Sequence, residues 1–112
     1  MQPLSRVTPA TVDVLECLLE GAGTATWGLQ VIKRSSRPPG TVYPLLDRLE
    51  RAGWVRSHWE DDDARSGPRR RLYALTADGA EAASRTVAAF GARRAPASAA
   101  APASPRGSGA PA

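Results

Sequence analysis

The segment from Pro39 to Gly53 constrains the fold of this chain more than any other stretch of the sequence. The preceding Pro38 and Pro39 itself forbid continuation of an earlier helix, and proline is favoured at the first position of a new one. Four apolar residues of the segment recur at i, i+3, i+4 and i+7, which places them on one stripe of an α-helix. We therefore predict a helix that packs through this stripe and ends at Gly53, a residue suited to a left-handed C-terminal cap. The stripe consists of Val42, Leu45, Leu46 and Leu49.

The opposite face of this helix is polar and forms the candidate binding surface. Thr41 and Tyr43 offer a hydroxyl and a phenol near the helix N-terminus, where free backbone N–H groups and the helix dipole favour an anion. Arg48 and Arg51 add guanidinium groups farther along. Because such groups bind phosphates and base edges, we predict that all four residues contact DNA. Two simpler interpretations compete: the Tyr43 ring packs against a neighbouring hairpin, and the arginines form solvated ion pairs worth well under about 1 kcal/mol.

Two helices are predicted before this segment. Thr8 offers an N-cap and Pro9 a first helical position, so a helix is expected from Pro9 to Glu20. A shorter second helix is expected to run from Trp27 into the polar stretch at 33–37. The chain therefore places a helix pair directly before two prolines and the amphipathic third helix.

Two alternating segments and one further helix are predicted after Gly53. Residues 54–60 and 69–75 read as the strands of a hairpin, whose long loop at 61–68 is expected to project as a flexible flap. Thr76 caps a fourth helix, which Gly91 is expected to end. The order predicts a mainly α fold with a small β-hairpin, a winged helix-turn-helix with a C-terminal helix. The apolar residues of the fourth helix are Ala80, Ala83, Val87 and Phe90.

The predicted hairpin carries the densest basic cluster of the chain, formed by Arg69, Arg70 and Arg71. Guanidinium groups on a return strand could reach the DNA backbone or a narrow minor groove, so we predict that at least one of them contacts DNA. The acidic run at 61–63 lies on the other side of the loop and would repel phosphate unless it turns away or pairs with these arginines. The sequence leaves that conflict open.

The charge and length of the chain agree with a small domain that binds an anionic partner. Ten Lys or Arg and six Asp or Glu lie between Lys33 and Arg71, so an excess of four positive charges falls around the polar helix face. Residues 1–94 are expected to form one domain, and the Ala-, Pro-, Ser- and Gly-rich tail at 95–112 is expected to be disordered. A domain of this size is only marginally stable by itself, and contact with a partner subunit would add stability, which favours a homodimer.

Several classes of protein are disfavoured by what the sequence lacks. No run approaches the roughly 20 apolar residues of a membrane span, and no signal peptide is evident, so we expect a cytoplasmic protein. Cys17 lies in an apolar run and is interpreted as a small core residue. His58 is the single histidine, and its spacing from Cys17 is not that of two metal ligands, so no metal site is predicted. With no nucleophile motif and no phosphate-binding loop, we predict neither an enzyme nor a cofactor.

The motifs resemble the PadR-like transcriptional regulators over roughly residues 8–90. The resemblance implies a homodimeric DNA-binding repressor, with the third helix in the major groove and the wing on the backbone or minor groove. It also implies dimer contacts made largely by the fourth helix, for which Val87 and Phe90 are the candidates. The matching motifs are Gly28-Leu29-Gln30-Val31-Ile32, Pro39-Gly40-Thr41-Val42-Tyr43-Pro44, Arg48-Leu49-Glu50, Gly53-Trp54-Val55, Trp59-Glu60 and the segment from Arg70 to Gly79.

Two other functions remain open from the sequence. A winged-helix module that docks a protein and has lost DNA binding would use the aromatic wing and the tail, and the acidic run supports it. A small hydrolase is the weaker alternative, because it needs a nucleophile and base that the sequence does not supply. A small-molecule effector is a further partner left open, since the three tryptophans could stack on a flat ligand, although tryptophan in a small domain is more often core.

Overall fold

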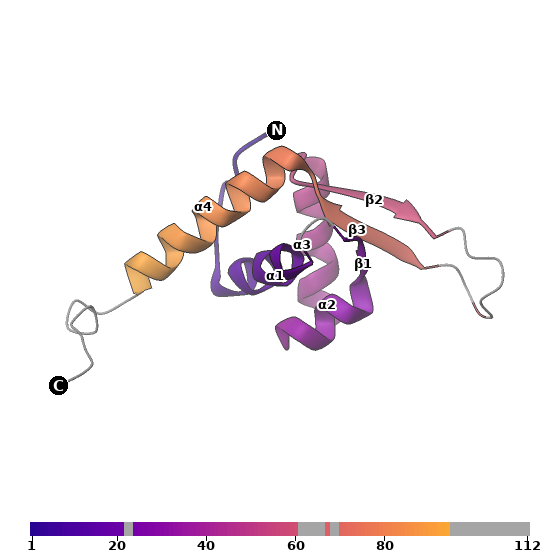
Figure 1. Cartoon of the computed structure of the whole chain (residues 1–112). Coiled ribbons are helices and arrows are strands. Elements are labelled where there is room, and N and C mark those ends of the chain that lie inside the picture. Colours follow the sequence, from indigo (N-terminus) through magenta and orange to yellow (C-terminus); the bar gives the residue numbers. More distant parts are fainter. Residues whose placement is uncertain (22–23, 61–66, 68–69, 95–112) are drawn as a thin grey trace.

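The computed structural model describes residues 1–21, 24–60, 67 and 70–94 (Figure 1). The expected disordered tail and nearly all of the expected flap, including the acidic run, lie outside these residues. Within them, no helix is long and apolar enough to cross a membrane. The elements are, in order, α1 (Pro9–Glu20), β1 (Thr26–Trp27), α2 (Gly28–Ser35), α3 (Pro39–Arg51), β2 (Val55–Trp59), β3 (Arg71–Leu75) and α4 (Ala77–Arg94).

Helix α1 begins and ends where the sequence predicts. The hydroxyl of Thr8 accepts from the backbone N–H of Thr11, and the Thr11 hydroxyl accepts in turn from the N–H of Thr8. This reciprocal cap satisfies two backbone groups at the helix start, while Pro9 occupies the first turn, where a missing N–H costs little. The cap therefore fixes the point at which the N-terminal segment turns into the helix.

Helix α3 ends in the Schellman arrangement that Gly53 makes available. Gly53 adopts a positive φ of 84°, its N–H donates to the Glu50 carbonyl, and the N–H of Trp54 donates to the Leu49 carbonyl. The predicted left-handed cap is confirmed. Pro44 lies inside the helix as its sixth residue, so it cannot donate to the Gly40 carbonyl, which lacks its usual intrahelical partner.

The sheet contains one strand more than the sequence predicts. Strand β3 is central and pairs antiparallel with both β1 and β2, with Tyr73 opposite Thr26 on one side and Ser57 on the other. The hairpin of β2 and β3 is confirmed. The two-residue strand β1 was not predicted, because a strand this short shows no alternation and is defined only by its pairing with distant residues.

Helix α4 starts as predicted but ends later. The Thr76 hydroxyl accepts from the Gly79 N–H at 2.9 Å, which confirms the cap. The prediction that Gly91 ends the helix is wrong, since α4 continues to Arg94. Gly91 is not among the glycines with positive φ, and Ala92, Arg93 and Arg94 beyond it are good helix formers, so the chain has no local reason to stop there.

The core lies where α1, α2, α3 and the sheet meet. The α3 stripe is its centre, with Val42, Leu46 and Leu49 fully buried and Leu45 6% exposed, and Cys17 belongs to the same cluster as expected. In Figure 1, α4 leads away from the sheet on the side opposite the free end of the hairpin. Three helices, a two-stranded wing and a separate C-terminal helix make a winged helix-turn-helix.

Candidate nucleic-acid interface

The outer face of α3 is open to solvent along its length. With the apolar stripe buried, the residues on the opposite side of the helix remain uncovered by the described part of the chain, and Tyr43 is 45% exposed. A Cβ atom built on Gly40 would have no atom within 4 Å, so this end of the helix offers bare backbone. A partner could approach the helix closely here. The exposed residues of α3 are Pro39, Gly40, Tyr43, Pro44, Asp47, Arg48 and Arg51.

Arg51 forms a solvated ion pair, which is the simpler of the two interpretations that the sequence allows for it. One guanidinium nitrogen lies 3.1 Å from a carboxylate oxygen of Asp47, one turn earlier on the same helix. The two side chains are 80% and 56% exposed, so solvent screens the pair strongly. The pair therefore holds Arg51 only weakly and leaves it able to turn to another anion.

Thr41 and Arg48 lie on the flank of α3 that faces the start of α1. They line a hollow of about 250 Å³ together with Arg6 and Thr8, and Thr41 is half-buried there. Arg6 is exposed and was not singled out from the sequence. Two guanidinium groups and two hydroxyls thus border one side of the helix.

Tyr43 lies on the other flank, against the first residue of α2. A Cβ atom built on Gly28 would fall 2.4 Å from the Tyr43 ring and 2.9 Å from its hydroxyl oxygen. Only glycine leaves room for the ring at this position. The ring thus packs partly on α2, and the rest of it stays exposed. Contact with DNA and packing against the protein, the two interpretations from the sequence, each describe only part of the ring's surroundings.

Arg70 and Arg71 approach the same flank from the wing. The Arg70 guanidinium carbon lies 3.5 Å from the centroid of the Trp27 ring. Arg71 lies over Trp59 at 5.4 Å and is also bound to Glu50 and Ser57. Tyr43, Arg70 and Arg71 therefore come together in space, whereas Arg69 lies outside the described residues.

The contacts of Arg71 join the wing to α3. Its guanidinium lies 3.6 Å from a Glu50 carboxylate oxygen and donates to the Ser57 hydroxyl at 3.1 Å, and that hydroxyl donates to Glu50. Tyr73 is buried beside this group, and burial raises the pKa of its phenol, an effect that the nearby Arg71 opposes. The network fixes the angle between the wing and α3.

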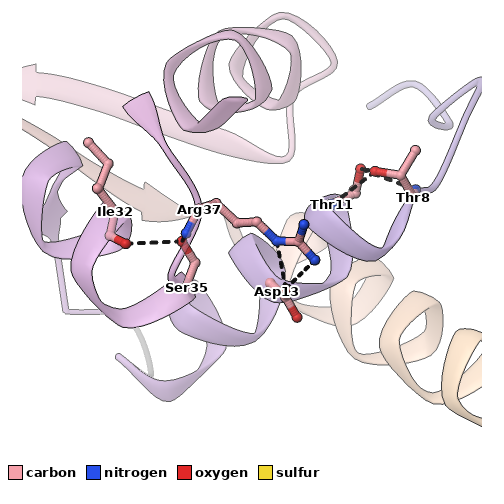
Figure 2. A network of polar contacts seen from close by, with 6 residues as sticks. All are labelled: Thr8, Thr11, Asp13, Ile32, Ser35 and Arg37. Carbon is pink, nitrogen blue, oxygen red and sulfur yellow. Dashed lines mark hydrogen bonds and ion pairs between the residues drawn. The ribbon is translucent and has the colours of Figure 1, made fainter. Parts of the chain in front are cut away.

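The turn between α2 and α3 is tied to α1 (Figure 2). Arg37 donates from Nε and Nη2 to one carboxylate oxygen of Asp13, at 2.9 and 2.8 Å, while its backbone N–H donates to the Ser35 hydroxyl. Ser36 adopts a left-handed φ of 59° and closes α2. These contacts set the direction in which α3 leaves the turn.

The predicted dimer residues lie on α4, away from this surface. Val87 packs in part against the core, and Phe90 is half-buried three residues farther along α4. Trp54 is core at 4% exposure, whereas Trp59 is 55% exposed on the wing. Among the described residues, no cluster of His, Cys, Asp and Glu suits a metal ion.

The chain matches the model of a known protein family. The model of the transcriptional regulator PadR-like family matches residues 18–85, which is more than half of the chain and includes α2, α3 and the wing. No curated protein matches the sequence significantly.

Comparison with solved structures gives several winged-helix proteins. A candidate DNA-binding protein from Ralstonia eutropha JMP134 is 27% identical with a TM-score of 0.58, covering 72% of this chain and 98% of that one. A PadR-like transcription factor from Bacteroides fragilis is 22% identical with a TM-score of 0.58, covering 74% and 81%. BpsR from Bordetella bronchiseptica, whose DNA binding is regulated by 6-hydroxynicotinic acid, is 26% identical with a TM-score of 0.60, covering 75% and 56%.

Proposed function

Because this chain belongs to the PadR-like family of transcriptional regulators, we propose that it is a sequence-specific DNA-binding regulator that acts in the cytoplasm as a homodimer and represses its target genes. The family consists of regulators and not of enzymes. One observation carries the proposal: α3 buries its apolar stripe while its opposite face is exposed, polar and open at Gly40. A helix of this kind fits the major groove of DNA.

The roles of the α3 residues follow from their places on the helix. Arg51 lies on the outer face and Arg48 on the flank that faces α1, and both are exposed, so their guanidinium groups can reach a phosphate or the edge of a guanine. Thr41 and Tyr43 flank the helix start on opposite sides, so each is suited to a phosphate on one wall of the groove. The arginines would thus supply both affinity and base readout, and the two hydroxyls would fix the register.

The wing residues are proposed to bind the DNA backbone beside the major groove. Arg70 and Arg71 lie at the start of β3, next to Tyr43, and Arg69 precedes them in the sequence. Phosphate contacts of this kind add affinity without sequence preference. Arg71 is engaged by Glu50 and Ser57, so Arg70 is the better placed of the two for a phosphate.

A homodimer is proposed from the size of the domain and from α4. Val87 and Phe90 are the large apolar residues on the distal half of this helix and are only half-buried within the described chain. Their contact with the same residues of a second copy would bury them fully, at about 25 cal/mol per Å² of apolar surface.

A small-molecule effector is also part of the proposal. BpsR provides a precedent, and this chain has a hollow of about 530 Å³ between the N-terminal segment and α4, lined by Leu4, Trp54 and Arg85 among others. The backbone N–H of Trp54 caps α3 by donating to Leu49. A ligand that displaced Trp54 would therefore shift the end of α3.

The test is a titration of fluorescent duplex from the region upstream of the gene, with anisotropy as the readout. The wild type should bind this duplex more tightly than a scrambled one, with log affinity falling by about 0.9 per phosphate contact per tenfold rise in salt. The variant Arg48→Ala/Arg51→Ala should lose at least about tenfold in affinity. Glu81→Gln, which removes an exposed charge from α4 outside the proposed effector hollow, should bind like the wild type.

The same titration separates the second candidate function. A protein-docking module is favoured by the exposed Trp59 on the wing. Absence of binding to any duplex at low salt would support that module and contradict the proposed regulator.

A further inference from the structure

A cleft of about 300 Å³ lies where the start of α2, the start of α3 and the wing meet. Trp27, Gly28 and Leu29 supply one wall, Tyr43 the second, and Arg70 and Arg71 the third. These residues come from three separate stretches of the sequence. No acidic side chain lines the cleft in the described part of the chain, and because Arg71 is paired with Glu50, the main positive charge of the cleft comes from Arg70.

The Arg70 guanidinium is held in one orientation at the edge of this cleft. It stacks on the Trp27 ring at 3.5 Å, and its backbone is fixed because the Arg70 N–H donates to the Glu60 carboxylate and the Glu60 N–H donates to the Arg70 carbonyl. Its Nε atom is buried without a hydrogen-bond partner, which costs free energy. The stack on Trp27 holds the guanidinium in place, and its terminal nitrogens have no carboxylate partner among the described residues, so they can donate to an anion.

Tyr43 brings a hydroxyl to the same cleft. Gly28 is the first residue of α2, and its missing Cβ leaves the space that the Tyr43 ring occupies. The ring therefore lies directly against the first turn of α2, with its hydroxyl at that end of the helix. A side chain at Gly28 would force the ring away.

The start of α2 supplies further donors. Its N-cap residue is Trp27, and no side chain caps the first turn, so the early backbone N–H groups have no side-chain acceptor. Leu29 in this turn is 45% exposed, which leaves the turn accessible. Free N–H groups at a helix start favour an anion.

We propose that this cleft is a phosphate-binding cradle for one backbone phosphate of the DNA. The Arg70 guanidinium, the Tyr43 hydroxyl and the first-turn N–H groups of α2 donate to the phosphate oxygens. Trp27 acts as a positioning residue that keeps Arg70 in place, and Gly28 makes room for Tyr43. The proposal rests on the proposed DNA-binding function and adds to it the residues that hold one particular phosphate.

The test replaces single phosphates of the bound duplex by neutral methylphosphonates. For the wild type, one position in each half-site should weaken binding by about tenfold, as expected for the loss of several charge-assisted hydrogen bonds. Tyr43→Phe and Trp27→Leu should each bind the unmodified duplex more weakly than the wild type does. In each variant, the methylphosphonate at that same position should cause a much smaller further loss of affinity, which is the penalty compared below. Trp59→Leu, which removes the tryptophan near Arg71 on the exposed wing, should keep the full penalty.

The outcomes distinguish the cradle from the broader function. Unchanged penalties in both Tyr43→Phe and Trp27→Leu, with DNA binding intact, would overturn the cradle alone. Failure of the wild type to bind any duplex would overturn the cradle together with the proposed function. Tyr43→Phe removes one oxygen atom and keeps the ring, so it remains decisive if Trp27→Leu fails to fold.

Discussion

Three arginines of this chain lie in different chemical surroundings. Arg37 is bound twice by Asp13, Arg71 lies on Glu50 and Ser57, and Arg70 stacks on Trp27 without an acceptor for its Nε. The first two are structural, because their charges are already paired with carboxylates. Arg70 has no such partner among the described residues, which makes it the arginine best suited to a ligand. The surroundings of each arginine, and not the total basic charge, decide its role.

The pair of Arg37 and Asp13 should contribute modestly to stability. The side chains are 36% and 35% exposed, so we expect Arg37→Ala to lower the free energy of unfolding by about 0.5 to 1 kcal/mol. Arg34→Ala is the control, because Arg34 lies 4.0 Å from Glu20 with both side chains at least half exposed, and no measurable change is expected. Urea unfolding of both variants is the measurement. Equal effects would show that the turn is not fixed by this pair.

The Cys17 thiol should make stability depend on pH in the alkaline range. Burial first, and Glu20 second, raise its pKa above the ordinary 9.0, so the unfolded chain loses the thiol proton before the folded one. The stabilisation is complete below that ordinary value and is lost as pH rises through the folded value. Wild-type stability should therefore fall more than that of Cys17→Ala between about pH 8 and about pH 10. Parallel curves would contradict the assigned burial of the thiol.

At the scale of the elements, the two faces of α3 require different kinds of residue. Its buried face requires branched apolar residues, while its outer face carries features that do not favour a helix, namely Gly40 and Pro44. The helix is stabilised by its packed stripe and by the cap at Gly53. The unfavourable residues all lie on the face proposed to meet DNA, as expected when local stability is sacrificed at a functional surface.

Gly40→Ala should separate stability from DNA binding. The new Cβ meets no atom of the protein, so the fold should gain about 0.5 kcal/mol from helix propensity. Because that Cβ would stand between α3 and the groove, DNA affinity should fall. Gly91→Ala is the matched control, since its Cβ is equally unobstructed and lies on α4. Thermal unfolding and anisotropy measure the two effects, and unchanged DNA affinity in Gly40→Ala would contradict a close approach at α3.

The four helices and the hairpin could be predicted from the sequence because their signals are local, whereas the short strand β1 could not. Thr8, Gly53 and Thr76 mark boundaries through hydrogen bonds to residues a few positions away, and all three were predicted correctly. The pairing of Arg70 with Trp27 could not be predicted, because these residues are far apart in sequence and meet only through the pairing of β1 with β3. The extension of α4 past Gly91 shows that a glycine ends a helix only where the following residues favour it.

At the scale of the whole molecule, the proposed DNA surface and the proposed dimer surface lie at different ends of the domain. The wing and α3 lie together on one side, and α4 leads away from them (Figure 1). A second copy bound along α4 would therefore leave both α3 helices free. This separation is what a symmetric dimer needs in order to place two helices in successive major grooves, about one helical turn apart.

Phe90→Glu should shift the proposed homodimer towards monomer, because a charge would be buried in the contact between the two α4 helices. Ala88→Glu is the control, since Ala88 is exposed and lies on the opposite side of the helix from Phe90. Light scattering coupled to size-exclusion chromatography gives the mass of each variant. An identical mass for Phe90→Glu and the wild type would exclude this residue from the dimer contact.

The placement of α3 in the major groove is tested most directly by chemical footprinting of the bound duplex with dimethyl sulfate, which methylates guanine N7 in the major groove. We predict two protected patches, about one helical turn apart, on the duplex bound by the wild type. Arg48→Ala/Arg51→Ala should lose this protection even at protein concentrations that restore binding. Guanine N7 atoms that stay fully reactive throughout the site in the wild-type complex would contradict the placement of α3 in the major groove.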